Sequence, residues 1–289
     1  MIRQYYLIFI TAILPSVLWG RGEAVESYSR AAVNFLKDFT GTERSNLVRP
    51  ADEQRMDRGG INLDSISVKQ EKALNTLLQS VLRTQGLKKY KPIMNAEQSS
   101  GRYRLTFYGD PAVDSLWAWQ IYGPELNLFI SVNDSGCLSV TPSFWTEESM
   151  KGDKNKPLLY YERTLAFKLL NDLESFKKYQ AVRSPVLPSY GHGTIDHDGL
   201  RLKEMSWDQM ILFIRLINSH LGNFKREIAR RYWDKIIEYD FKQLRFNWYG
   251  SLSPGQSYAY YIYGPSIEIY FQSTSESTYV YLRSPEEKK

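Results

Sequence analysis

Residues 117–124 read WAWQIYGP, and residues 258–265 read YAYYIYGP. Each stretch ends in Gly-Pro, and its glycine follows an earlier glycine by the same interval, since Gly109 and Gly250 lie 14 residues before Gly123 and Gly264. The single offset that carries Gly109 onto Gly250 therefore aligns both glycines, the Ile-Tyr-Gly-Pro run and the aromatic positions between them. Self-similarity of this kind indicates that one supersecondary unit occurs twice in the chain.

The similarity continues upstream at a slightly shorter offset. Residues 60–63 read GINL and residues 199–202 read GLRL, and each run is followed by a serine, Ser67 or Ser206, that can cap a helix by accepting an orphan backbone N–H. Apolar residues then recur at helical spacing, and the alternating aromatic segments beyond them predict strands. The sequence predicts an α+β fold in which two pseudo-equivalent units, each a helix plus an antiparallel sheet, form one compact body.

The N-terminus predicts export. Arg3 is followed by a mostly apolar stretch, residues 7–19, and then by the small residues Gly20, Gly22 and Ala24, which is the three-part pattern of a secretory signal. The apolar stretch is short for a hydrocarbon layer of about 30 Å, which favours cleavage over a retained anchor. We expect a secreted or periplasmic protein with no transmembrane helix after signal cleavage.

The predicted organisation has five parts. These are a signal peptide (1–22), an N-terminal helix and loop (23–59), a first repeat unit (60–145), a connecting helix and loop (146–198) and a second repeat unit (199–285).

Composition excludes several classes of protein. A hydrophobic share of 43% is enough for a substantial core, and a net charge of +5 with scattered Lys and Arg lacks the concentrated footprint of a nucleic-acid-binding protein. Cys137 is the only cysteine, so no intrachain disulfide can form. The chain has no phosphate-binding loop, dinucleotide fingerprint or nucleophile elbow, and no cofactor is predicted.

Several motifs together are similar to one known family, the exported bacterial family called domain of unknown function 3500. The resemblance covers most of residues 60–285 and rests on the helix around Gln70, the strand with Trp117 and Trp119 and the following Gly123, Thr141-Pro142 with Phe144, and Gly264-Pro265 with Glu268 and Arg283. The family brings no established activity with it.

The chain departs from this family at four histidine positions. Pro124 and Glu125 stand where the family typically has two histidines, and Ser277 and Tyr279 stand in place of a His-x-His pair. If those histidines bind a metal or shuttle protons, the resemblance implies that this chain has lost them. Glu268 is what remains of that group.

Glu125 and Glu268 are the candidate catalytic residues. Strand alternation places Glu268 on the opposite face from Ile267 and Ile269, where it can line a pocket or a solvated surface. If the two units bring Glu268 close to Glu125, the pair could act as the two carboxylates of a glycoside hydrolase.

A metal site is not predicted, although one loop contains ligand types suited to zinc. His192 and His197 are five residues apart and lie beside Asp196 and Asp198. No partner cluster is evident elsewhere, so the two histidines remain weak candidates.

Aromatic residues give the remaining functional signal. Trp117, Trp119, Tyr260 and Tyr263 lie on the repeated strands, where exposed rings could stack on a sugar or a peptide and buried rings would fill the core. The favoured interpretation is a non-catalytic or degraded-site binding protein with an extracytoplasmic ligand, either a glycan or a peptide. The alternative is a hydrolase that uses the paired carboxylates or the loop metal.

Overall fold

Both predicted helix starts are present in the computed structural model, which describes residues 21–52, 59–95, 103–132, 138–147, 156–188 and 198–284. Ser67 and Ser206 each form a capping box, in which the serine side chain accepts from the backbone N–H three residues on. Gln70 and Gln209 complete the boxes by accepting from the serine N–H at 2.7 and 2.9 Å. The predicted signal peptide, residues 1–22, falls almost wholly outside the described residues and stays a prediction.

The first unit runs from the N-terminal helix to a long central strand. Its elements are α2 (Arg21–Leu36), α3 (Gly41–Leu47), β1 (Val48–Arg49), β2 (Ile61–Asn62), the 3-10 turn η1 (Leu63–Ser65), α4 (Val68–Val81), α5 (Thr84–Met94), β3 (Arg104–Tyr108), β4 (Trp117–Tyr122), β5 (Leu126–Val132) and β6 (Leu138–Glu147).

The second unit repeats this order. Its elements are α6 (Tyr160–Asp172), α7 (Ser175–Ala181), β7 (Val182–Ser184), β8 (Leu200–Arg201), the 3-10 turn η4 (Leu202–Glu204), α8 (Trp207–Leu221), α9 (Arg226–Lys235), the π-helical turn η5 (Ile236–Asp240), β9 (Arg245–Gly250), β10 (Tyr258–Gly264), β11 (Ile267–Ser273) and β12 (Ser277–Arg283).

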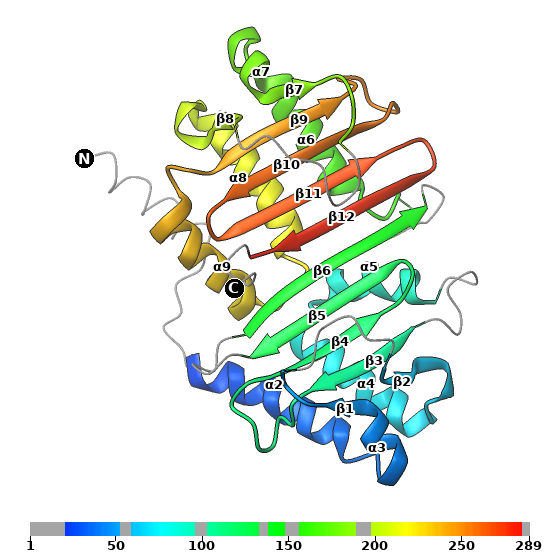
Figure 1. The fold of residues 1–289 in the computed structure, drawn as a ribbon. Coiled ribbons are helices and arrows are strands. Elements are labelled where there is room, and N and C mark those ends of the chain that lie inside the picture. The colour runs from blue at the N-terminus through cyan, green and yellow to red at the C-terminus, as the bar shows by residue number, and fades with distance from the viewer. Residues whose placement is uncertain are drawn as a thin grey trace.

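The strands form one continuous 12-stranded sheet with the order β1-β3-β4-β5-β6-β12-β11-β10-β9-β7, while β2 pairs with β3 and β8 with β9 (Figure 1). The two halves of this order are equivalent: β1, β3, β4, β5 and β6 of the first unit hold the same places as β7, β9, β10, β11 and β12 of the second. The two units meet where β6 pairs antiparallel with β12. Each unit therefore contributes five strands to this path, mostly antiparallel, and one short strand beside it, β2 or β8. The predicted α+β duplication is confirmed.

The repeat includes more of the chain than the matching sequence stretches. β1 pairs parallel with β3 from Val48 opposite Phe107, and β7 pairs parallel with β9 from Val182 opposite Trp248. The short helix before each of these strands has seven residues in both units. Parts of the predicted N-terminal helix and loop (23–59) and of the predicted connecting helix and loop (146–198) thus occupy equivalent places in the two units.

The tight turns after β3 and β9 explain one of the repeated glycines. Gly109 and Gly250 have φ values of 76° and 81°, in the left-handed region that L side chains rarely adopt. A Cβ on either residue would also lie within 3.0 Å of a backbone carbonyl oxygen, at 2.8 and 2.6 Å respectively.

The main core lies between the sheet and the helices, of which α6 and α8 are seen behind the strands in Figure 1. Trp119 and Trp248 are among its largest fully buried side chains. A smaller duplicated cluster lies on the other face, with Tyr108 and Phe129 in the first unit and Tyr249 and Tyr270 in the second. None of the helices in the described ranges combines the length and apolar character that a bilayer crossing requires.

Candidate functional site

Glu268 lies on the sheet face opposite the helices, as strand alternation predicts. It is directly across from Arg283 in the β11–β12 register, and its carboxylate accepts a hydrogen bond from the Arg283 Nε. The Arg283 guanidinium also lies over the ring of Tyr281, 5.0 Å from the ring centre. Glu268 is 5% exposed, so it is a buried ion-pair partner among tyrosines.

Tyrosines around this ion pair are kept protonated. Burial is the main reason that the pKa of Tyr261 and of Tyr281 is raised above its ordinary value. Tyr263 is half-buried on the same face, opposite Glu268 in the β10–β11 register. Of the four aromatic candidates, Tyr263 is the one with a partly exposed ring on this face.

Glu125 lies far from Glu268. It is half-buried before β5, where it accepts a hydrogen bond from the Tyr103 hydroxyl at 3.1 Å. Three strand spacings, β5 to β6 to β12 to β11, separate the two strands, which amounts to about 14 Å at roughly 4.8 Å a step. Paired carboxylates of glycosidases lie at most about 9.5 Å apart, so the structure does not bring this pair together.

Trp117, Trp119 and Tyr260 face the helix layer and are at most 3% exposed. Alternation along β4 and β10 turns these positions inward, where large rings fill the space between sheet and helices. A ligand could reach them only if the helix layer moved.

The loop histidines His192 and His197 lie outside the described residues, so their metal-binding role stays untested. In the part of the chain that is described, no three His, Cys, Asp or Glu residues come together to hold a metal ion. His220 is not a surface residue of its helix: it is 3% exposed, and its Nε2 hydrogen-bonds the Tyr260 hydroxyl at 2.7 Å. Burial lowers the pKa of His220 to about 4, so the ring is neutral at pH 7.

A larger candidate site lies on the helix side, where the two units meet. A cavity of about 910 Å³ lies between α5, α6, α8 and α9, and we call it the α5–α9 pocket. Seven of the side chains that line it are cationic and two are acidic: Arg83, Lys88, Lys89, Lys156, Arg215, Lys225 and Arg226, against Glu162 and Glu227. The described wall of the pocket is therefore strongly basic.

Two helix N-termini meet at this pocket. The chain segments that lead into α5 and α9 run antiparallel, with the Arg83 N–H bonded to the Asn223 carbonyl and the Lys225 N–H to the Val81 carbonyl, at 2.9 and 2.8 Å. Gly86 permits this approach, since a Cβ there would lie 2.2 Å from the Asn223 oxygen. Neither N-cap, Arg83 or Lys225, makes a side-chain capping bond. Helix N-termini carry partial positive charge and favour anions.

A buried ion pair lies in the pocket wall. The Lys89 ammonium donates to Glu162 Oε1, and the side chains are 13% and 1% exposed. Glu162 Oε2 is buried and has no hydrogen-bond partner among the described residues. The carboxylate thus neutralises Lys89, while the other cations of the wall outnumber the one remaining acid, Glu227.

Two tyrosine rings form part of the apolar wall. Tyr160 and Tyr161 are 37% and 54% exposed and pack edge to face with ring centres 5.5 Å apart. The Lys156 ammonium lies over both, 4.1 Å from the Tyr160 ring and 5.3 Å from the Tyr161 ring. The pocket can therefore contact both charged and flat apolar parts of a ligand.

Sequence reasoning missed this pocket. Lys225 and Arg226 look like the solvated face of a helix when read along the chain, and Arg83, Lys156 and Arg215 come from three other segments. The pairing of Leu82 with Phe224 brings the starts of α5 and α9 together. A usable signal was the lack of a Ser, Thr, Asp or Asn N-cap before α5 and α9, together with cations at both starts.

Comparison with known proteins agrees with the duplicated motifs and adds no function. No curated protein and no solved structure matches the chain. The family model described as "Protein of unknown function (DUF3500)" matches residues 21–287, which is nearly all of both units. The chain therefore belongs to the DUF3500 family.

Proposed function

We propose that this protein is an exported binding protein and that its ligand is a small anion with two or more phosphate, sulfate or carboxylate groups, held in the α5–α9 pocket. The observation that carries the proposal is the basic wall of that pocket at the meeting point of two helix N-termini, where the described lining residues include seven cationic side chains and two acidic ones.

The pocket is suited to binding rather than to covalent chemistry by its own residues. Its one fully buried acid, Glu162, is already paired with Lys89. The nearby His220 is neutral and buried, and its ring is hydrogen-bonded to the Tyr260 hydroxyl. The alternative of a hydrolase with paired carboxylates has less support, because the sheet register holds Glu125 and Glu268 apart. The exposed Tyr161 ring adds a surface for the non-polar part of a ligand.

Charge reversal tests the proposal. Isothermal titration with inorganic pyrophosphate at low ionic strength should show binding that weakens as salt is added. Arg83→Glu or Arg215→Glu should weaken it about tenfold, since a charge pair at 4 Å contributes about 1 kcal/mol even in water and reversal replaces attraction with repulsion.

Lys72→Glu is the matched control, because Lys72 is an exposed cation on α4 that does not line the pocket. It should leave the affinity unchanged. Equal losses in all three variants would show that only the overall charge matters, and the proposal would then fail.

A further inference from the structure

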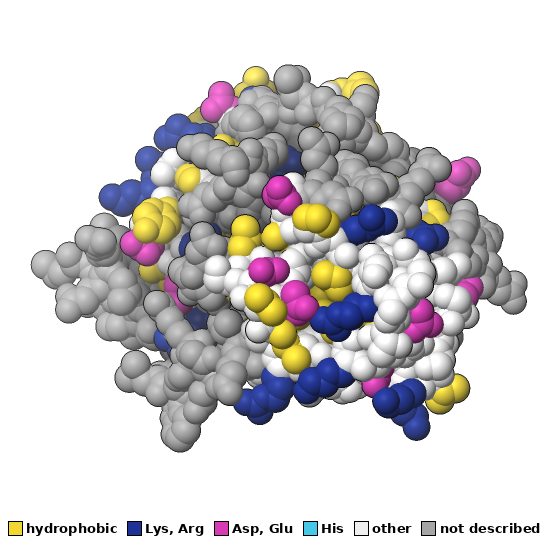
Figure 2. Space-filling model, turned by 60° about the horizontal axis from the view of Figure 1, so that its bottom comes forward, with side chains coloured by type: hydrophobic (Ala, Val, Ile, Leu, Met, Phe, Trp, Pro, Cys, Tyr) yellow, Lys and Arg dark blue, Asp and Glu magenta, His cyan; other side chains and the backbone are white. Residues whose placement is uncertain are grey.

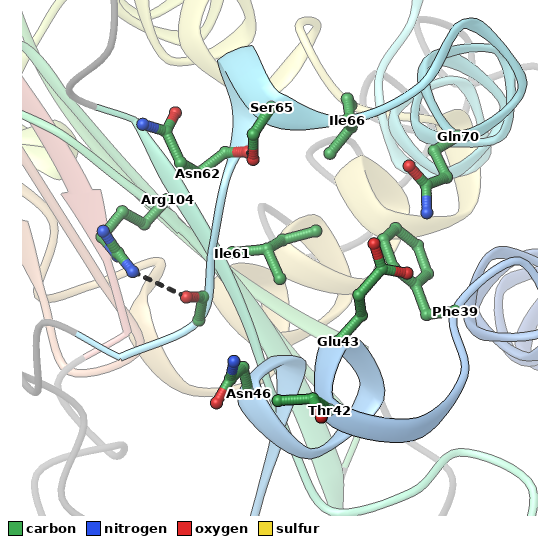
Figure 3. A pocket seen from close by; sticks show the side chains of 11 residues that line it. Phe39, Thr42, Glu43, Asn46, Ile61, Asn62, Ser65, Ile66, Gln70 and Arg104 are labelled. Carbon is green, nitrogen blue, oxygen red and sulfur yellow. Dashed lines mark hydrogen bonds between the residues drawn. The ribbon is translucent and has the colours of Figure 1, made fainter.

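A second, smaller cavity has a different chemical character. It is a solvent-open pocket of about 350 Å³ between α3, the β2–η1 segment, α4 and β3, and its wall mixes uncharged polar residues with apolar ones (Figure 3). The two charged residues in the wall are Glu43 and Arg104. The Arg104 guanidinium is engaged by backbone, since it donates to the carbonyls of Gly59 and Gly60 at 3.1 and 2.8 Å.

Glu43 is the remaining charge in the wall. It projects from α3 towards Gln70 and Phe39 in Figure 3, and no hydrogen bond or ion pair of its carboxylate is found within the described ranges. Figure 2 shows that the visible described surface mixes acidic, basic and apolar side chains.

The second unit contains a region equivalent to this cavity, and the two can be compared residue by residue. Gln70 Nε2 donates to the Asp38 carbonyl, and Gln209 Nε2 donates to the Asp172 carbonyl, at 3.1 and 2.8 Å. The offset that carries Asp38 onto Asp172 also superimposes the bounds of α3 on those of α7. Glu43 of the first unit thus corresponds to Lys177 of the second.

In the second unit the Lys177 ammonium lies beside the side-chain amide of Gln209, the glutamine of the capping box. Lys177 Nζ donates to Gln209 Oε1 at 3.1 Å and lies 3.2 Å from Glu174 Oε2. Glu174 also accepts from Gln209 Nε2 at 3.1 Å, and this hydrogen bond is the main reason that the pKa of Glu174 is lowered to about 2. This place is therefore built around a primary ammonium with a carboxylate and an amide oxygen as acceptors.

We infer that the first unit binds the primary ammonium group of a ligand in the α3–α4 cavity, at the place that Lys177 fills from within in the second unit. Glu43 supplies the counter-charge, and the amide oxygens of Gln70 and Asn46 lie in the same wall as acceptors. The ligand class is a primary alkylamine, either a free small amine or the lysine side chain of a peptide. This site is separate from the anion pocket and opposite in charge.

Amine titration followed by NMR chemical shifts tests the inference on the whole protein. n-Butylamine should bind at millimolar concentrations and shift the amide signals of α3 and the start of α4, whereas n-butanol should not. Glu43→Gln should weaken the binding at least fivefold. Glu43→Lys should abolish it, because the new side chain places an ammonium at the position equivalent to that of Lys177. Glu276→Gln, which removes an exposed carboxylate of the second unit, is the control and should bind as the wild type does.

A blocked Ala-Lys-Ala peptide distinguishes the two sources of the ammonium. Binding of the peptide at least as tight as that of n-butylamine assigns the site to lysine side chains, and binding of the free amine alone assigns it to small amines. The inference is overturned if n-butanol binds as well as n-butylamine, if Glu43→Gln changes nothing, or if neither amine binds. Circular dichroism of each variant confirms that it is folded.

Discussion

Replacing Lys89 by Met should destabilise the protein strongly, because it leaves Glu162 buried without a counter-ion. The two side chains are 13% and 1% exposed, and breaking a buried pair by removing one partner costs about 3–5 kcal/mol. The reverse change, Glu162→Gln, should cost less, about 1–3 kcal/mol, since the Lys89 ammonium borders the pocket and water can reach it. The asymmetry between the two single variants is the distinctive expectation.

The pH dependence of the Lys89→Met variant follows from the same argument. A buried carboxylate without a counter-ion favours its protonated form in the folded state. The folded variant then binds more protons than the unfolded chain, so its stability falls as pH rises. The loss relative to wild type should therefore be smaller at pH 5 than at pH 8.

Urea unfolding at both pH values, on the two single variants and the double variant, measures these effects as a double-mutant cycle. The double variant should be more stable than the sum of the single losses implies, by about 1–3 kcal/mol. If each single variant costs less than about 1 kcal/mol and neither shows a pH dependence, Glu162 is accessible to water and the account of the pocket wall is wrong.

Three further outcomes are expected. Gly250→Ala should lower the free energy of unfolding more than Gly255→Ala, although both glycines have positive φ. A Cβ at Gly250 would lie 2.6 Å from the Ser257 carbonyl oxygen, whereas one at Gly255 would meet nothing within 4 Å. The backbone strain of positive φ costs about 1–2 kcal/mol at either site, so equal losses in the two variants would argue against the tight turn at Gly250. Protonation of His220 should lower the free energy of unfolding by up to about 3 kcal/mol as the pH falls from 6.5 to 4, because His220 binds a proton in the unfolded chain at a higher pH than in the folded one. The stability of His220→Gln, measured over the same pH range, should lack this part of the decrease. Ser206→Ala should cost about 1 kcal/mol in thermal unfolding through loss of the helix cap, and an unchanged midpoint would contradict the capping box.

Local sequence signals were enough to predict the duplication. The glycines at 109 and 250 were identifiable because a tight turn with positive φ restricts the choice of residue. Ser67 and Ser206 were identifiable as N-caps because few residue types satisfy an orphan N–H. Signals of this kind depend on the nearest few residues and survive divergence between the copies.

Contacts between segments far apart in the chain could be predicted less well from the sequence. The joining of the two sheets through β6 and β12 depends on strands that lie far apart in the chain. The offset between the copies also grows along the chain, being shortest at Asp38, longer at Ser67 and longest at Gly109, because the connecting segments differ in length. A comparison at one fixed offset therefore loses α2, α3 and β1.

The candidate sites show the same division. Alternation correctly placed Glu268 away from the core, but its partner Arg283 is set by the register of β11 with β12. The exposure of Trp119 could not be decided from alternation alone, because both sheet faces carry aromatic residues. The basic pocket requires four segments to converge, and none of them is unusual by itself.

Crystals soaked in tungstate, with anomalous scattering recorded at the tungsten edge, test the central claim most directly. We predict that the strongest peak lies between the N-termini of α5 and α9, within reach of Arg83 and Arg215, and that it disappears in Arg215→Glu crystals. Strong tungsten peaks at other basic surfaces, with none in the α5–α9 pocket, would contradict the proposal that this pocket is an anion-binding site.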